Sequence, residues 1–151
     1  AEVIATLNLA WDYATAKAAM EDILANYPQI DGILSHGGAM TQAAIDAYVE
    51  QGLPLVPMTG EASNGFLRVW LEQADNGLQS MAFCNPTWIS VTALDTAIRI
   101  LNGEEVEKEI TVTVPPVTLE TAKDLYRPDV NDSFWVHTYL SDAEIKELFP
   151  K

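Results

Sequence analysis

Four short segments of the chain carry side chains that could bind or transform a small molecule. Each segment follows an apolar, β-prone run and precedes a helical pattern. Together they offer aromatic faces, hydroxyls, amides and carboxylates, and none of them contains Lys or Arg. This mixture suits polyhydroxyl ligands such as sugars, or amines, and is poor for phosphates. The candidate site residues are Trp11, Asp12, His36, Gly37, Gly38, Thr59, Glu61, Asn64 and Cys84.

Trp11 and Asp12 stand just past the first apolar run, in the segment NLAWDYA. An indole in this position can stack on the apolar face of a sugar ring, and the alternative is packing on the helix that follows. The Asp12 carboxylate can bind a ligand, or it can be the N-cap of a helix that begins near Ala14. The sequence is compatible with both alternatives for each residue.

His36 and the two glycines after it lie in the segment GILSHGGAM. No G-x-S-x-G elbow accompanies His36, and His137 is remote in sequence, so catalysis and metal binding are disfavoured. A ligand hydrogen bond and a local structural role are the alternatives. Gly37 and Gly38 lack the spacing of a dinucleotide fingerprint and the ending of a P-loop. They indicate close backbone approach or a positive φ, and we expect no cofactor and no metal.

The third and fourth segments, TGEASNG and CNPTW, add a hydroxyl, a carboxylate, an amide and a thiol. Glu61 and Asn64 are candidate ligand contacts, with Thr59 beside them. The alternative for Glu61 is a position in a first helical turn, where the helix dipole favours negative charge. Cys84 has no cationic neighbour in sequence to lower its pKa. We interpret it as a buried or pocket-lining thiol, and we predict no enzymatic activity.

The acidic composition restricts the partners of the chain. Its 151 residues include 22 acidic and 8 basic ones, for a net charge of -14. Such a surface repels nucleic acids and anionic membranes, so no nucleic-acid partner is expected. The single cysteine excludes an internal disulfide. We find no signal peptide and no apolar run long enough to span a bilayer, and we interpret the abrupt start at Ala1 as a cut end.

The elements that must position these residues alternate between strand and helix along the chain. Short connections between them predict βαβ units, a mostly parallel sheet and helices on both faces, which is a three-layer αβα fold. The predicted strands are Val3–Leu7, Ile30–Ser35, Leu53–Met58, Leu78–Cys84 and Glu109–Val114. The predicted helices are Thr15–Tyr27, Met40–Gln51, Gly65–Asn76, Trp88–Asn102, Leu119–Leu125 and Asp142–Phe149.

The last part of the chain, residues 118–151, differs in character from residues 1–117. It is rich in charges, turns and aromatics, and Ser141 and Glu144 have the spacing of a capping box. Dense aromatics in an irregular segment predict a tail that packs on the body, with direct ligand or partner contact as the alternative. We therefore expect a body over 1–117 and a C-terminal extension over 118–151.

Two long segments resemble one known family. WDYATAKAAMEDILANYPQIDGILSHGGAMTQAAIDAYVEQG and SMAFCNPTWISVTALDTAIRILNGEE resemble the C-terminal lobe and the later crossover of type I periplasmic sugar-binding proteins, the ribose-binding-protein-like solute receptors of ABC transporters. The resemblance covers roughly Val3 to Val114. It implies a periplasmic-binding-protein-like lobe, a missing N-terminal lobe, an ABC transporter permease as partner and a periplasmic or extracytoplasmic location.

The resemblance also implies roles for individual residues. Trp11 matches the stacking aromatic of the family. Gly37 falls where many members have a ligand-binding Asn, and Gly38 falls at the usual Asp. Thr59 lies near another usual Asp, and Cys84 lies near a polar crossover residue. Three departures from the family pattern therefore lie in the pocket, so Glu61, Asn64 or His36 are expected to supply the polar contacts.

The leading hypothesis is therefore capture of a sugar or a similar small polar ligand for an ABC transporter, by closure of two lobes and without chemistry. The first alternative is the effector-binding core of a LacI-type transcriptional regulator, which resembles the same lobes. The second alternative is an enzyme domain of Rossmann or flavodoxin type.

Overall fold

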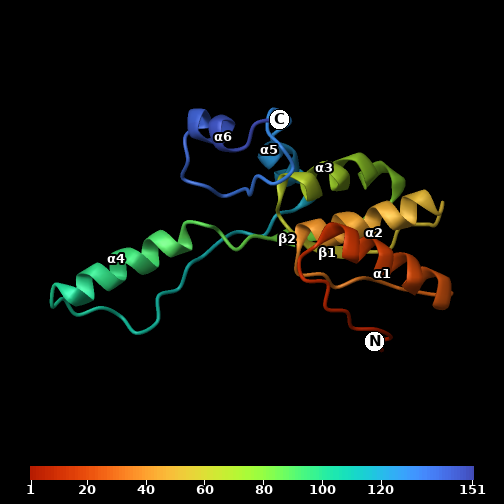
Figure 1. Cartoon of the computed structure of the whole chain (residues 1–151), viewed down its shortest axis with the longest axis horizontal. Coiled ribbons are helices and arrows are strands. Elements are labelled where there is room, and N and C mark those ends of the chain that lie inside the picture. Colours follow the sequence, from red (N-terminus) through yellow and green to blue (C-terminus); the bar gives the residue numbers. More distant parts are fainter.

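The six predicted helices are all present in the computed structural model, which describes residues 1–151 (Figure 1). Apolar side chains at helical spacing face the interior of the body, as Ala43, Ala44 and Tyr48 do on the second helix. The capping box predicted for Ser141 and Glu144 is also confirmed. The helices are α1 (Tyr13–Asn26), α2 (Gly38–Glu50), α3 (Asn64–Gln73), the 3-10 turn η1 (Ala74–Asn76), α4 (Ile89–Leu101), α5 (Leu119–Leu125) and α6 (Asp142–Leu148).

The sheet is small and parallel. It consists of β1 (Met58–Glu61) and β2 (Ser80–Phe83), paired in register from Met58 with Ser80 to Glu61 with Phe83. A single parallel bridge between Ile33 and Met58 adds the segment before α2 at the other edge of β1. The α/β class with a parallel sheet is thus confirmed.

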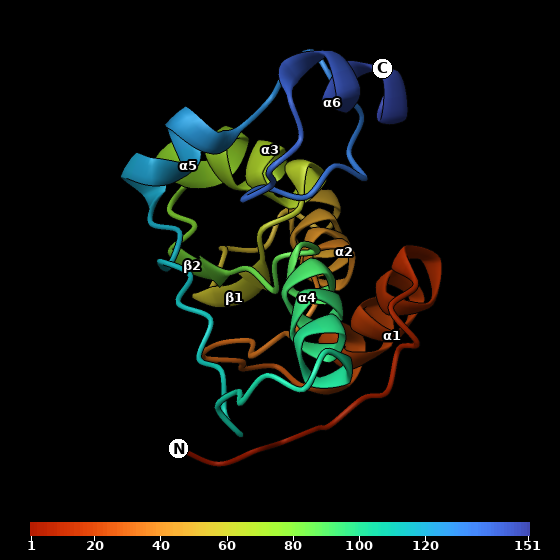
Figure 2. The ribbon, with the colours of Figure 1, turned by 90° about the vertical axis from the view of Figure 1, so that its left-hand side faces the viewer.

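Helices α1, α2 and α3 form one layer on one face of the sheet (Figure 2). The paired segments follow one another across the sheet in chain order, and right-handed crossovers then place the intervening helices on the same face. The opposite face leaves Met81 and Phe83 exposed, by 45% and 55%. The chain therefore supplies the sheet and one helical layer, two of the three layers expected from the sequence.

Two of the predicted strands are not formed. Val3–Leu7 and Glu109–Val114 make no backbone hydrogen bonds, and neither belongs to a sheet. Their β-prone side chains are largely exposed: Val3 is 80% exposed and Ile110 45% exposed. A strand needs a hydrogen-bonded partner, and no neighbouring segment of this chain supplies one.

The other predicted strands are shorter than expected. Ile30–Ser35 is reduced to the bridge at Ile33, and Leu53–Met58 begins to pair only at Met58. Pro54 and Pro57 precede that point, and a proline has no N–H to donate to a ladder. The fourth strand lies within its predicted bounds.

The core lies where α2 and α3 meet the sheet. Ile45 and Phe66 are fully buried, Met58 is 2% exposed and Trp70 is 1% exposed. The rings of Phe66 and Trp70 are stacked with their centroids 5.7 Å apart. This core fixes the start of α3 and the end of β1, which both border the candidate site.

The C-terminal tail, residues 126–137, packs on the start of α3. The backbone N–H groups of Asn64 and Gly65 donate to the carbonyls of Phe134 and Asp132, at 2.7 and 3.0 Å. These are helix-terminal N–H groups that have no partner within the helix. The tail thus completes the N-terminus of α3.

Helix α4 extends away from the body (Figure 1). None of its residues is buried, and its apolar side chains, such as Leu94 and Ile98, are 63% and 48% exposed. No helix of the structure combines the length and the apolar character that crossing a membrane requires.

Candidate ligand-binding site

The segments after the parallel strands meet at the carboxyl edge of the sheet and contact one another in series. The Trp11 ring lies against Gly37, and Gly38 lies against the backbone of Glu61. The Glu61 carboxylate in turn lies near the backbone N–H of Asn85, which acts to lower the pKa of Glu61. We call these five residues, with the adjoining Asp12 and His36, the strand-end edge. All four segments that the sequence singles out are represented in it.

Trp11 presents an open aromatic surface at this edge. Ala10 and Trp11 both have positive φ, +50° and +60°, in a region that bulky residues rarely adopt. A Cβ at Gly37 would lie 2.8 Å from ring atom Cε3 of Trp11 and 2.6 Å from the Met40 methyl carbon. The indole therefore packs against the start of α2, while Trp11 stays 63% exposed.

Gly37 and Gly38 allow close approach between segments. A Cβ at Gly38 would collide with Ser63 Oγ and would lie 2.6 Å from the carbonyl oxygen of Glu61. Gly37, the residue before α2, has an extended φ of -134°. Of the two interpretations from the sequence, close approach is confirmed and the positive φ is wrong. No side chain at either position reaches a ligand.

Asp12 is the N-cap of α1, as one of its two interpretations predicts. Its Oδ1 accepts hydrogen bonds from the backbone N–H of Thr15 at 2.8 Å and from Thr15 Oγ1 at 2.6 Å. These bonds lower the pKa of Asp12 below its ordinary value. Oδ2 makes no hydrogen bond within the chain, and because Asp12 is exposed this oxygen can still accept one from a ligand hydroxyl.

His36 and Thr59 differ in how far their side chains are engaged. His36 is exposed and makes no side-chain hydrogen bond within the chain. Thr59 Oγ1 accepts from the Ser35 N–H at 2.9 Å and donates to the Ser35 carbonyl at 3.0 Å. The Thr59 hydroxyl thus ties two strand ends together, and His36 keeps both ring nitrogens available to a ligand.

Glu61 is a half-buried carboxylate at the end of β1. Burial raises the pKa of Glu61 above its ordinary value of 4.5, and the Asn85 N–H acts in the opposite direction. Glu61 makes no salt bridge. A carboxylate held in this way is a good acceptor for ligand hydroxyls, since burial strengthens its hydrogen bonds.

Cys84 lies beside Glu61 and points its thiol at the tail. Its Sγ donates to the carbonyl of Val136 at 3.1 Å. Burial, with the Glu61 charge as a smaller cause, raises the pKa of Cys84 from 9.0 to about 11. Thiolate is therefore scarce at neutral pH, in keeping with a thiol that is not a nucleophile.

We expect Cys84 to be alkylated slowly by iodoacetamide at neutral pH. Raising the pKa from 9.0 to about 11 reduces the thiolate fraction by about 100-fold. The measurement is the alkylation rate against pH for the folded protein, with the same cysteine in the urea-unfolded protein as its control. Equal rates in the two states at pH 7 would contradict the raised pKa.

Asn64 is drawn inside the protein and not toward the edge. It is 1% exposed, and its Nδ2 donates to the carbonyl of Arg127 at 2.8 Å. Its Oδ1 accepts from the Arg127 N–H at 2.9 Å. The amide is thus occupied by the tail, and no part of it is exposed to a ligand in this structure.

The structure also places side chains near the edge that the sequence did not single out as site residues. Tyr13 and Gln42, on α1 and α2, border a hollow together with Trp135 of the tail. Trp135 is held there by an antiparallel bridge to Ser63. The sequence predicted that the aromatic tail packs on the body, but nothing in it indicated which aromatic reaches the strand ends, because Trp135 is 72 positions further along the chain than Ser63.

Comparison with known proteins gives one family and a consistent set of folds. The family model described as "Periplasmic binding protein domain" matches residues 1–105. No curated protein sequence matches the chain. The solved structures described next are 20–22% identical to this chain, so they show the fold alone.

Three solved structures illustrate that fold. An ABC transporter periplasmic solute binding protein from Actinobacillus succinogenes 130z with bound D-allose has a TM-score of 0.63 and 22% identity, over 82% of this chain and 43% of its own. An ABC transporter solute binding protein from Agrobacterium vitis with bound D-fucose has a TM-score of 0.66 and 21% identity, over 83% and 45%.

The third structure is the periplasmic binding protein component of the arabinose ABC transporter from Shewanella sp. ANA-3, bound to α- and β-L-arabinofuranose. Its TM-score is 0.66 and its identity 20%, over 81% of this chain and 41% of its own. This chain thus spans less than half the length of each structure. The periplasmic-binding-protein-like fold is confirmed, and neither the regulator nor the enzyme alternative is favoured.

Proposed function

We propose that this chain, which belongs to the periplasmic binding protein domain family, forms one wall of a cleft that captures a sugar or a similar small polar ligand. The observation that carries the proposal is the strand-end edge. It presents an exposed indole and two acidic side chains, Asp12 and Glu61, and its segments contain no Lys or Arg. A sugar ring matches this combination, because it has an apolar C–H face for the indole and hydroxyls for the carboxylates.

In this proposal, the side chains available at the edge each contact the ligand. The Trp11 indole covers the C–H face of the sugar ring, and Asp12 Oδ2 and the Glu61 carboxylate accept hydrogen bonds from hydroxyls. His36 is a further hydrogen-bonding partner at the same edge. Asn64 and Thr59 are left out because other parts of the chain occupy their side chains.

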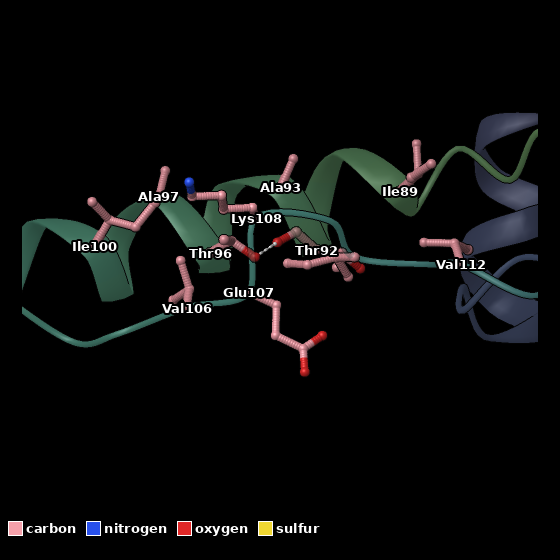
Figure 3. A pocket seen from close by; sticks show the side chains of 11 residues that line it. Ile89, Thr92, Ala93, Thr96, Ala97, Ile100, Val106, Glu107, Lys108 and Val112 are labelled. Carbon is pink, nitrogen blue, oxygen red and sulfur yellow. Dashed lines mark hydrogen bonds between the residues drawn. The ribbon is translucent and has the colours of Figure 1, made fainter.

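A second lobe is part of the proposal, and the region around α4 supports it. A hollow of about 500 Å³ lies between α4 and residues 106–112, and Figure 3 shows side chains of both segments around it. Ile89, Ile100 and Val106 are among its apolar lining residues. Apolar surface of this kind is stabilised when another element covers it.

In the complete arrangement, residues 1–117 contribute a partial lobe and the crossover, and 118–151 form a C-terminal extension. The second lobe packs on α4 and closes over the strand-end edge when ligand binds. Because ligand touches both lobes only in the closed form, it shifts the population toward closure. An ABC transporter permease then recognises the closed form, on the extracytoplasmic side of a membrane.

Calorimetry tests the proposed function. The two-lobed protein that contains this chain is titrated with D-allose, D-fucose, L-arabinose, D-glucose, D-galactose and sorbitol. We expect saturable binding of at least one sugar. Absence of heat with all of these compounds and with the disaccharides named below, from protein shown to be folded, would overturn the proposal.

The pH dependence of sugar affinity should report on Glu61. An ionised carboxylate is the better acceptor, and burial holds its pKa above 4.5 in the free protein. Affinity should therefore rise as pH increases from 4.5 through the raised pKa, and then level off. Glu61→Gln should abolish this rise and weaken binding about tenfold at pH 7.

The matched control is Glu147→Gln, an exposed carboxylate on α6 that has no salt bridge. It should leave both the affinity and its pH profile as they are in the unmodified protein. A pH profile that survives Glu61→Gln would show that another group titrates with binding.

A further inference from the structure

A second hollow lies beside the strand-end edge, between the first turns of α1, α2 and α3 and the tail. Its volume is about 440 Å³, within the range of roughly 300–1,000 Å³ that small-molecule sites have. We call it the tail hollow. It is lined by Tyr13, Ala39, Gln42, Ser63, Asp132, Ser133 and Trp135.

Internal hydrogen bonds hold the walls of the tail hollow in place. The Tyr13 hydroxyl donates to Asp46 Oδ2 at 2.7 Å. Asp132 Oδ2 accepts from Arg68 Nη2 at 2.8 Å, and a second bond joins Arg68 Nε to Asp132 Oδ1 at 3.3 Å. The hollow is therefore preformed, which reduces the entropic cost of binding.

Glycine at position 65 lets two of these walls meet. A Cβ there would lie 2.8 Å from Asp132 Cβ and 2.8 Å from Gln42 Oε1. The backbone N–H of Gly65 also donates to the Asp132 carbonyl at 3.0 Å. The tail is thus fixed against α3 at the point where it closes the hollow.

The groups left free in the tail hollow are those that bind sugars. The Gln42 amide makes no hydrogen bond within the chain, and the Trp135 indole is only half-buried. Arg68, which bonds to the lining residue Asp132, is also paired with Glu72. An amide beside an indole, without a free positive charge, suits a neutral polyhydroxyl ring and disfavours an anion.

The tail hollow adjoins the strand-end edge. Ser63 lines the hollow, and its Oγ also lies against Gly38 of the edge. Ala39 of the hollow follows Gly38 directly, and Tyr13 is two residues from Trp11. The two sites thus share the start of α2 and the N-cap of α3.

We propose that the tail hollow is a second sugar-ring subsite, so that the ligand is a disaccharide or another glycoside and not a free monosaccharide. The inference rests on the proposed function, and it goes beyond the family match, which ends at residue 105 while the tail lies at 126–137. One ring stacks on Trp11. The second ring contacts Trp135 and receives hydrogen bonds from the Gln42 amide.

The test compares single rings with pairs of rings in the two-lobed protein. The probes are D-glucose and D-galactose against maltose, cellobiose, lactose and melibiose, measured by calorimetry. We expect at least one disaccharide to bind about tenfold more tightly than either monosaccharide. Trp135→Ala and Gln42→Ala should each remove most of that preference and leave monosaccharide affinity within about twofold.

Two further variants keep the test decisive. Ala39→Leu fills the hollow without removing any packing, and it should weaken disaccharide binding alone. Tyr139→Ala removes an aromatic of the C-terminal extension that stacks on Trp88 outside the hollow, and it should leave the preference intact. If monosaccharides bind and disaccharides bind no more tightly, or if the hollow variants weaken both classes equally, the second subsite is wrong and the proposed function stands. If no sugar binds, both are wrong.

Discussion

Replacing Asn64 with alanine should destabilise the protein by about 3–5 kcal/mol and release the C-terminal tail. Asn64 is 1% exposed, and its amide is shared among backbone groups of the tail. Nδ2 lies 2.8, 3.3 and 3.2 Å from the carbonyl oxygens of Arg127, Val130 and Asn131. The Arg127 N–H donates to Oδ1 at 2.9 Å. Alanine would leave these groups without partners inside the protein.

The cost is high because a buried polar group that loses its partner keeps its desolvation penalty. Each such group costs about 1–3 kcal/mol, and the tail would also lose its hold on the start of α3. Thermal unfolding without ligand should therefore show a melting temperature lower by roughly 10 °C. Limited proteolysis should cut the variant within residues 126–151 before it cuts the body.

Asn76→Ala is the matched control for this experiment. Asn76 lies in η1, is exposed, and donates only to the Gln73 side chain at 2.9 Å. Its replacement should change stability by less than about 0.5 kcal/mol. If Asn64→Ala melts like the control and resists protease equally, the tail is not held by this amide.

Replacing Trp11 with alanine should weaken sugar binding by roughly tenfold to a hundredfold while the unfolding temperature stays nearly unchanged. Burying an aromatic face against a ligand contributes about 1.5–3 kcal/mol, which corresponds to that range of affinity. In the free protein Trp11 is 63% exposed, so its removal takes away little packing. The substitution is thus expected to lower sugar affinity without lowering stability, which is the behaviour of a residue that contacts the ligand.

Two control variants are compared with Trp11→Ala. Trp11→Phe keeps a ring and should retain most of the affinity. Tyr27→Ala removes an aromatic at the opposite end of α1 and should leave affinity unchanged. A Trp11→Ala protein with unaltered affinity for a sugar that does bind would exclude stacking at this position, and a large loss of stability would show that the indole is chiefly a packing residue.

The helices could be predicted from the sequence because their signals are local. The bounds of α5, Leu119–Leu125, match the prediction, and the capping box of Ser141 and Glu144 is formed as expected. Apolar spacing and capping depend on residues within a few positions of one another, and such patterns fix a helix before any tertiary contact is considered.

The strands could be predicted only in part, because a strand requires a partner. Val3–Leu7 and Glu109–Val114 have β-prone side chains but make no backbone hydrogen bonds here. Met58–Glu61 became a strand because Ser80–Phe83 and Ile33 flank it. Alternating apolar residues show that a segment is suited to a sheet, and only the tertiary structure decides whether a neighbour is present.

By itself the sequence determined the α/β alternation, the helices, the absence of positive charge at the strand ends, and the indole beside an acidic helix cap. These follow from residue type and short-range spacing. Only the tertiary structure decided which polar side chains face outward. In it, Asn64 bonds to the tail, Trp11 packs against Gly37, and Trp135 lines a hollow together with Gln42. Those outcomes depend on contacts between distant segments, such as the bridge between Ser63 and Trp135, which are 72 positions apart. The side-chain types along the chain do not indicate which distant backbone groups will need a partner.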